Sequence, residues 1–386
     1  MNTLLPHLCR SVLTCLLTAA ALLAPTASAQ PADKPAADKP AESTQPAKKP
    51  KETLANRQIT GRATRVAILD FGPPVSWGDL VGGTVGITVT AKSFKEVIPM
   101  LEADKADVVV IRINSGGGLL DEMKPFQELF QFEYEPRFRT VAWVHSAISC
   151  AAMSPWPLDE FYMEPEGNIG ACTAYSGPLV AMKDEPLLNV LENMRIASEW
   201  GGRDPKIMRS MQIQEPLSAN VDEFGNVTFF QDSTSGKIRL NPDGQVLTLN
   251  AIDAVRVKFA RGIASNTEEL MKLMNITEYE IVGQKATRHI QNTLRRNHDI
   301  DKAVGKTTIE YKLAVGAALS LSGENNREQR AAEVGRARRA LAVIKKQCEL
   351  NRNFRYSLSD YFDGQNLNEE WFENQEYNLK RIAEGR

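Results

Sequence analysis

The chain has 386 residues, of which 42% are hydrophobic and 24% charged, the composition of an ordinary globular protein. Its 46 Lys and Arg residues nearly balance its 48 Asp and Glu residues, and the net charge of −2 argues against a nucleic-acid-binding protein. A mean hydropathy of −0.31 excludes a protein with many membrane spans. Five cysteines without a CxxC pair argue against a disulfide scaffold and against a zinc ribbon.

The first 29 residues have the features of a secretory signal peptide. Arg10 supplies the positive charge, and the apolar stretch at 11–23 is too short to cross a bilayer comfortably. The small residues at 27–29 (ASA) form a cleavage site, so we expect a mature chain that begins at Gln30 and is periplasmic or secreted. An uncleaved anchor helix is the alternative.

Residues 30–60 are predicted to form a disordered linker. This segment is rich in Pro, Ala and Lys, repeats the sequence ADKPA, and holds few large apolar side chains that could build a core. We expect a folded domain at 61–283 and a mainly helical region at 284–386.

Short apolar runs with strand character alternate with helical patterns in the first half of the folded chain. The patterns predict strands at 65–71, 107–113, 140–144 and 160–163, and helices at 93–103, 119–132 and 149–153. The run DVVVIRI at 107–113 is typical of a strand that a parallel sheet buries on both faces. This alternation predicts right-handed βαβ crossovers, and therefore an α/β fold with a mostly parallel sheet.

The pattern becomes mainly helical after residue 178. We predict helices at 187–200, 204–212, 248–257, 266–274 and 284–351, the last interrupted at 322–326, and a terminal helix within 361–386. The turn signals FGN and NPDG frame short alternating runs, which predict a β-meander or a hairpin at 221–249. The many charges on the C-terminal helices are typical of a solvated face or a partner surface.

Three consecutive glycines follow the second predicted strand, in the sequence INSGGG (113–118). Glycines at the end of a strand allow the backbone to approach a ligand closely and to point N–H groups into a cleft. The segment could cradle a phosphate or form an oxyanion hole, and a plain strand-to-helix turn is an equally simple interpretation. It has neither the GxGxxG pattern nor the GK[ST] of nucleotide-binding loops, so nucleotide binding is disfavoured.

Ser149 follows the third predicted strand, in the sequence AISCAAM (147–153). The start of a helix favours developing negative charge, and small neighbours leave room for a substrate, which suits a nucleophilic serine. The alternative is an ordinary helix cap at Ser146 or Ser149.

Together these segments resemble the Clp-protease/crotonase fold, and within it the signal peptide peptidase A and NfeD-type serine proteases. Those proteins carry a strand that ends in a glycine-rich turn, a serine at a small-residue helix start, and a further strand that ends in an IGA stretch. The corresponding segments here are INSGGG (113–118), ISCAA (148–152) and MEPEGNIGA (163–171). The resemblance covers residues 64–282 and implies a ββα superhelix, while the helical C-terminal region lies outside it.

This resemblance implies which residues carry the chemistry. Ser149 would be the nucleophile, and the N–H groups of Gly117 and Cys150 would form the oxyanion hole. A nucleophile at Cys150 would break the spacing to the third segment. Two positions depart from the family pattern, because Gly116 replaces its usual proline and Ala151 its usual glycine.

The resemblance also implies a lysine as the base, on the segment that leads into a helix with a Gly-Arg turn at its end. That turn is found here at 202–203, and counting back reaches Glu185, with Lys183 as the nearest lysine. A lysine base must be neutral, so Lys183 would need burial to lower its pKa. Clp protease itself uses histidine and aspartate. His145 precedes Ser149, and it is more simply a packed or surface histidine.

The function that these residues imply is that of an exported serine endopeptidase with a Ser–Lys dyad and no metal or cofactor. Its partners would be a polypeptide substrate, other copies of the chain and a membrane surface that it contacts peripherally, and not nucleic acid. Two other functions stay open. One is a catalytically inactive scaffold of the same fold that acts through its helical C-terminal region. The other is a crotonase-type acyl-CoA enzyme, against which the signal peptide argues.

Overall fold

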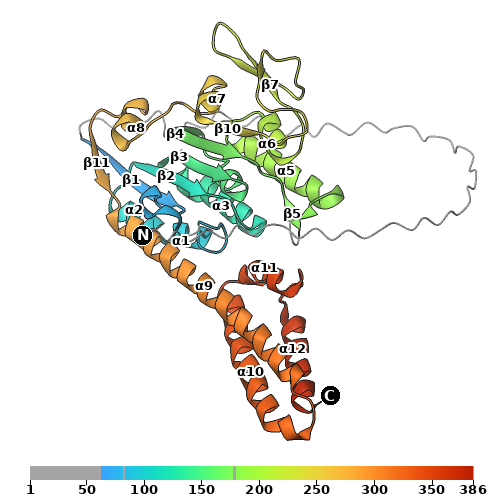
Figure 1. Cartoon of the computed structure of the whole chain (residues 1–386). Coiled ribbons are helices and arrows are strands. Elements are labelled where there is room, and N and C mark those ends of the chain that lie inside the picture. The colour runs from blue at the N-terminus through green and yellow to red at the C-terminus, as the bar shows by residue number, and fades with distance from the viewer. Residues whose placement is uncertain (1–61, 81–82, 177–179, 386) are drawn as a thin grey trace, which may run out of the picture. The chain divides into compact units, whose positions relative to one another are not determined.

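The computed structural model describes residues 62–80, 83–176 and 180–385 (Figure 1). The predicted signal peptide and its cleavage site, together with the linker at 30–60, lie outside the described residues. Within the described ranges, no helix is both long enough and apolar enough to cross a membrane.

A six-stranded sheet forms the centre of the fold, with the strand order β10-β4-β3-β2-β1-β11 (Figure 1). Neighbouring strands run parallel except for β10, which pairs antiparallel with β4. The strands are β1 (Thr64–Phe71), β2 (Val108–Ser115), β3 (Arg139–Ile148), β4 (Glu160–Gly170), β10 (Thr248–Asn250) and β11 (Tyr279–Val282). The predicted α/β class with a mostly parallel sheet is confirmed, and β1 to β4 are the four predicted strands.

Two short helices replace the single helix predicted at 93–103. These are α1 (Ala91–Glu96) and α2 (Ile98–Ala103), which meet at Val97. Pro99 lies in the first turn of α2 and has no N–H to donate, so the hydrogen-bond pattern of α1 cannot continue through it.

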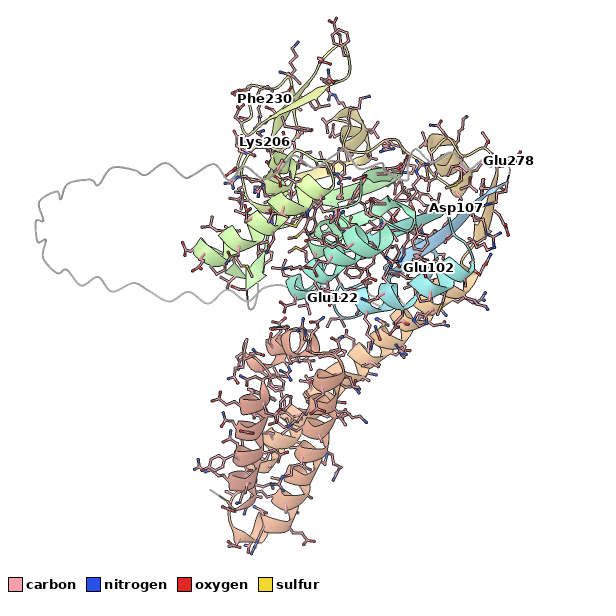
Figure 2. The ribbon with its side chains drawn as sticks, turned by 180° about the vertical axis from the view of Figure 1, so that it is seen from behind. Glu102, Asp107, Glu122, Lys206, Phe230 and Glu278 are labelled. Carbon is pink, nitrogen blue, oxygen red and sulfur yellow. The ribbon has the colours of Figure 1, made fainter. Side chains whose placement is uncertain are left out.

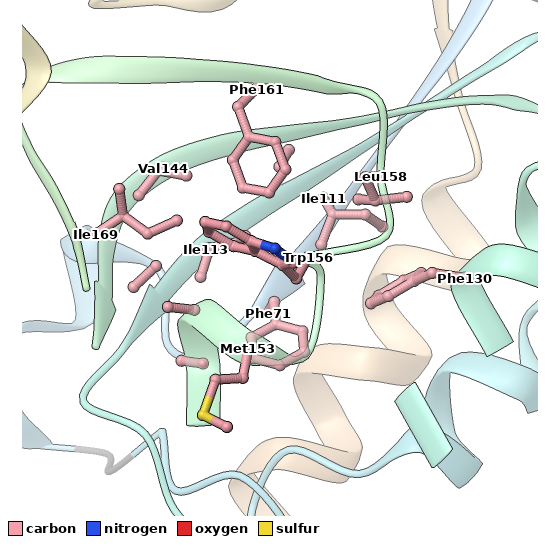
Figure 3. Packing of buried hydrophobic residues seen from close by; sticks show 14 of the residues in the cluster. Phe71, Ile111, Ile113, Phe130, Val144, Met153, Trp156, Leu158, Phe161 and Ile169 are labelled. Carbon is pink, nitrogen blue, oxygen red and sulfur yellow. The ribbon is translucent and has the colours of Figure 1, made fainter. Parts of the chain in front are cut away.

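Aromatic side chains from β1 and from the neighbouring helices form a core beside the sheet. The predicted helix at 119–132 is here a 3-10 turn η3 (Leu120–Glu122), helix α3 (Met123–Leu129) and a π-helical turn η4 (Phe130–Tyr134). Phe71, Phe94, Phe126 and Phe130 are fully buried and pack ring against ring. Each such side chain contributes about 1.5–3 kcal/mol by leaving water. Figure 3 shows Phe71 and Phe130 in one hydrophobic cluster with residues of β2, β3 and β4.

A short helix lies between β3 and β4, and a small hairpin, two longer helices and a three-stranded antiparallel sheet follow β4. They are α4 (Cys150–Met153), β5 (Tyr175–Ser176), β6 (Val180–Ala181), α5 (Asp184–Trp200), α6 (Pro205–Gln212), β7 (Ser218–Val221), β8 (Val227–Phe230) and β9 (Ile238–Arg239). The antiparallel pair β7–β8 confirms the predicted hairpin, although its first strand begins earlier than expected. The order β8-β7-β9 is not that of a meander, because β9 pairs with β7 and not with β8.

The helix predicted at 248–257 begins later than expected, as α7 (Ala251–Arg256). The side chain of Asn250 accepts a hydrogen bond from the Asp253 N–H and caps the helix, so the residues before it are free to form β10. Helix α8 (Thr267–Leu273) follows where a helix is predicted. The short strands β10 and β11 are not predicted, because three or four residues carry too little pattern.

The C-terminal region is helical, as predicted. Its elements are α9 (Gln284–Ser320), η5 (Glu324–Asn326), α10 (Arg327–Leu350), α11 (Phe354–Ser357), η6 (Ser359–Phe362) and α12 (Glu369–Ala383). The break falls at 321–326, where the sequence predicts it. The first turns of α9 pack into the core of the sheet, whereas its later turns join α10 and α12 in a second hydrophobic cluster.

Candidate active site

The glycine turn at 116–118 and Ser149 lie at the carboxyl ends of two neighbouring parallel strands, β2 and β3. Ser115 at the end of β2 pairs with Ala147 near the end of β3. A Cβ atom placed on Gly117 would lie 2.7 Å from the Ser149 Cβ and 3.2 Å from the Cys150 backbone nitrogen. The structure therefore brings Gly117, Ser149 and Cys150 together. Such an edge is where α/β sheets usually bind ligands.

Ser149 has a strained backbone. Its φ of 56° and ψ of −128° lie in a region that residues other than glycine seldom adopt. Its N–H donates to the Gly170 carbonyl at 2.9 Å, and its own carbonyl accepts from the Ala152 and Met153 N–H groups. The side chain is half-buried, and its hydroxyl makes no hydrogen bond with the described residues. A sharp strand-to-helix turn with a free hydroxyl is the geometry of a serine nucleophile.

Cys150, directly after Ser149, is fully buried. Its thiol donates to the Leu119 carbonyl at a sulfur–oxygen distance of 3.2 Å. Burial raises the pKa of the Cys150 thiol to about 12, so the thiol stays protonated at neutral pH and is a poor nucleophile. The Cys150 thiol is therefore unsuited to nucleophilic attack at neutral pH.

Backbone contacts fix the glycine turn from both sides. The Gly117 carbonyl accepts from the Val85 N–H at 2.9 Å, and the Gly117 N–H donates to the Ser115 hydroxyl at 3.1 Å. A Cβ atom on Gly118 would lie 2.2 Å from the Val85 carbonyl oxygen, whereas one on Gly116 would meet nothing within 4 Å. Only the last two glycines are therefore required sterically. The open space at Gly116 would equally accept a larger residue.

Ser115 contacts the glycine turn directly, and the sequence analysis does not single it out. It lies inside the INSGGG segment and donates to the Gly83 carbonyl while accepting from the Gly117 N–H. Its hydroxyl thus holds the amide that is predicted to bind the oxyanion. Its position within the INSGGG segment is the sequence feature that could have indicated this contact. By contrast, the Cys150 N–H has no hydrogen-bond partner among the described residues.

Lys183 lies at the N-cap position of α5, directly after the hairpin β5–β6. The helix that it precedes ends at Trp200, just before the Gly-Arg turn, as the resemblance implies. The Lys183 side chain is exposed, and it makes no hydrogen bond or ion pair with the described residues. Lys183 is thus on the expected segment, while contact with Ser149 is not present in this conformation. His145 pairs instead with Glu164, at 2.8 Å between Nδ1 and Oε2.

A buried arginine joins the end of α5 to the segment after α4. The Arg203 guanidinium donates to the Trp156 and Leu158 carbonyls and lies over the ring of Phe161, 4.5 Å from its centroid. Burial lowers the pKa of Arg203 to about 10, so it remains charged at neutral pH. This contact fixes the C-terminal end of α5 relative to the segment that follows α4. The first turn of α5, which follows Lys183, lies at the surface. Within the described part of the chain, no three His, Cys, Asp or Glu side chains gather as a metal site.

Known proteins similar to this chain fall in the family that the motifs indicate. A family profile described as the N-terminal domain of NfeD1b matches residues 89–284. The membrane protein NfeD1b of Bacillus subtilis (strain 168) is 24% identical over 219 residues, which cover 51% of this chain and 45% of that protein. The chain thus aligns with about half the length of this curated relative.

Solved structures of the membrane-bound stomatin-specific protease 1510-N are also similar. A mutant of it shares 16% identity, with 58% of this chain and 90% of that chain covered and a TM-score of 0.39. A mutant in complex with a substrate peptide shares 15%, with 58% and 86% covered and a TM-score of 0.40. The protease from Pyrococcus horikoshii, described as specific for a stomatin homolog, shares 15%, with 57% and 92% covered and a TM-score of 0.35. Because the NfeD1b profile matches half of its residues, the chain belongs to the NfeD1b N-terminal domain family.

Proposed function

We propose that the protein is a serine endopeptidase in which Ser149 attacks the scissile carbonyl of a polypeptide. The observation that carries this proposal is the strained backbone of Ser149 beside Gly117. Strained residues other than glycine persist where the surroundings over-determine them, and they gather at active sites. A plain helix cap explains the geometry less well, because the Ser149 side chain caps no N–H of α4.

The oxyanion of the tetrahedral intermediate would be held by the N–H groups of Cys150 and Gly117. The Cys150 N–H is unoccupied and lies at the start of α4. The Gly117 N–H would exchange the Ser115 hydroxyl for the developing oxyanion, a stronger acceptor. Loss of one such donor usually costs about 10²–10³-fold in rate.

Lys183 would take the proton of the Ser149 hydroxyl as the acyl–oxygen bond forms, and would pass it to the departing amine as the peptide bond breaks. A water molecule would then hydrolyse the acyl-enzyme. We propose that the exposed Lys183 side chain turns toward Ser149 when substrate covers the site. Catalytic hydrogen bonds often form only in the substrate complex.

The substrate would be an extended polypeptide with apolar side chains, in the membrane or in the periplasm. Tyr175, Val180 and Leu188 flank Lys183 along the chain and are exposed apolar residues. They would pack against substrate or against a second copy of the chain. The relative in Bacillus subtilis is named a membrane protein, which supports a role at the membrane surface.

Export to the periplasm or the medium is part of the proposal and has its own test. N-terminal analysis of protein recovered after expression with the full leader should give Gln30 as the first residue. A chain that keeps Met1 and sediments with membranes would contradict the cleavage.

A fluorophosphonate probe tests the nucleophile directly, because only an activated serine attacks its phosphorus and displaces the fluoride. The wild type should be labelled, Ser149→Ala should not, and Ser146→Ala should be labelled like the wild type. Ser146 is a matched control, since it is a half-buried serine on β3 whose hydroxyl donates to Asn168. Labelling that survives Ser149→Ala would contradict the assignment.

An inactive scaffold is the second candidate, and the exposed position of Lys183 favours it. A scaffold would fail to react with the probe at any pH while staying folded. Labelling of the wild type at Ser149 therefore separates the two functions.

A further inference from the structure

The C-terminal helices contact the loop at 84–89, which lies against the glycine turn. Ile87 of this loop is buried in the hydrophobic cluster of α9, α10 and α12. Leu119, directly after the glycine turn, packs against the same cluster. Figure 2 shows Glu122, three residues further on, on the side of the sheet domain that faces these helices. The C-terminal region is therefore joined to the segment that carries the predicted oxyanion hole.

Asn353, just before α11, makes the polar part of this contact. It is 4% exposed, and its Nδ2 donates to the Gly86 carbonyl at 2.9 Å and to Glu122 Oε2 at 3.1 Å. The Asn351 side chain donates to the same Gly86 carbonyl at 3.2 Å. Glu122 in turn accepts from the Ala91 N–H through its other oxygen. One buried amide thus holds both the loop and the segment that follows the glycine turn.

The loop passes this constraint to the glycine turn through its backbone. The Val85 N–H donates to the Gly117 carbonyl at 2.9 Å, and the Val85 carbonyl accepts from the Leu119 N–H at 3.0 Å. The lack of space for a Cβ atom on Gly118 shows that the two backbones are in close contact. A displacement of Gly86 would therefore move Val85, and with it the carbonyl and the N–H of Gly117.

We propose that Asn353 is a positioning residue for the peptidase reaction, which sets the glycine turn at the distance from Ser149 that acylation requires. This inference rests on the proposed function. Asn353 touches neither substrate nor Ser149 and acts through Gly86 and Val85. A misplacement of about 1 Å in such a turn can cost on the order of 10²-fold in rate. The C-terminal helical region is then part of the catalytic unit.

A purely structural role for Asn353 would also slow the enzyme, so the control must weaken the C-terminal helices without touching the loop. Asn368 is suited to this, because its side chain accepts from the Trp371 N–H and caps α12. Asn368→Ala removes a helix cap within the same region. Among the described residues, it has no contact with Gly86 or Glu122.

The experiment compares the full chain with its Asn353→Ala and Asn368→Ala variants. Fluorophosphonate labelling at several probe concentrations separates the maximal rate from the probe affinity, and hydrogen exchange follows the amides of Val85 and Leu119. For Asn353→Ala we expect a maximal rate at least about 10-fold lower, an unchanged probe affinity and faster exchange at both amides. Asn368→Ala should match the wild type in all three. Should Asn353→Ala fail to fold, Asn351→Ala weakens the same contact and should shift the rate in the same direction.

Equal maximal rates for the wild type and Asn353→Ala would overturn the proposal, as would an equal loss in Asn368→Ala. A folded wild type that never labels would overturn the proposed peptidase function instead. Hydrogen exchange would then decide the coupling by itself, since unchanged exchange at Val85 and Leu119 in Asn353→Ala refutes it.

Discussion

Replacement of Ser149 by glycine should make the protein more stable while abolishing its proposed activity. Glycine adopts positive φ without steric cost, so Ser149→Gly would release the strain at φ 56° and ψ −128°. The strain of a residue in such a region is on the order of 1–3 kcal/mol. The Ser149 hydroxyl makes no hydrogen bond with the described residues, so no hydrogen bond with them is lost.

Glycine is also more flexible in the unfolded chain, and this lowers the free energy of unfolding by about 0.5–1 kcal/mol. The net effect is a stabilisation of about 0–2.5 kcal/mol, or a rise in Tm of about 2–4 °C for each kcal/mol in a domain of this size. Ser146→Gly is the matched control. It makes the same chemical change three residues away, in the extended backbone of β3, where no strain is released. There the same substitution should destabilise by about 0.5–1 kcal/mol through the flexibility of glycine, and by about 0.5–1.5 kcal/mol more through loss of the hydrogen bond to Asn168.

Urea unfolding of the wild type and both variants measures these differences, and the fluorophosphonate probe reports activity on the same samples. We expect Ser149→Gly to unfold at higher urea than Ser146→Gly and to be unlabelled. If both variants lose the same stability, Ser149 stores no strain, and the main argument for its role as nucleophile falls.

Three further predictions follow from the same geometry. Gly117→Ala should abolish probe labelling, because its Cβ would press on Ser149, while Gly116→Ala, with open space around it, should leave labelling unchanged; equal labelling of the two would contradict the turn's role. Lys183→Arg should lower the rate of labelling by about 10²–10⁴-fold, because a guanidinium cannot accept the proton; wild-type rates in Lys183→Arg would exclude it as the base. Since burial raises the pKa of Cys150 to about 12, the thiolate is absent at pH 8, and iodoacetamide should modify this residue only after unfolding, as peptide mass spectrometry can show.

The sequence predicts the sheet well because its strands are buried on both faces. The apolar run around Val110 is rich in β-branched residues, which favours a buried strand over a helix. The closeness of Gly117 and Ser149 could also be predicted, because the two residues follow neighbouring strands and parallel strands end at the same edge of a sheet. Local signals fail where a single residue decides the outcome, as when Pro99 divides one helix into two or Asn250 delays the start of another.

Contacts between distant segments could not be predicted from local pattern. Asn353 and Gly86 are 267 positions apart, and neither belongs to a motif. Pairing them needs the whole path of the chain, in particular the long helix α9 that leads from the sheet to the C-terminal region. The place of Lys183 was predictable along the sequence, whereas the exposure of its side chain was not.

The strain at Ser149 requires contacts that hold it, and these come from elements that the strand order brings together. The Ser149 N–H is bound by Gly170 at the end of β4. Gly170 is itself confined, because a Cβ atom there would lie 2.4 Å from the Leu247 carbonyl oxygen, just before β10. The antiparallel edge strand β10 therefore supports the turn from one side, as Val85 supports the glycine turn from the other. The short strand β10 thus holds Gly170 in place, and Gly170 in turn holds the backbone of Ser149.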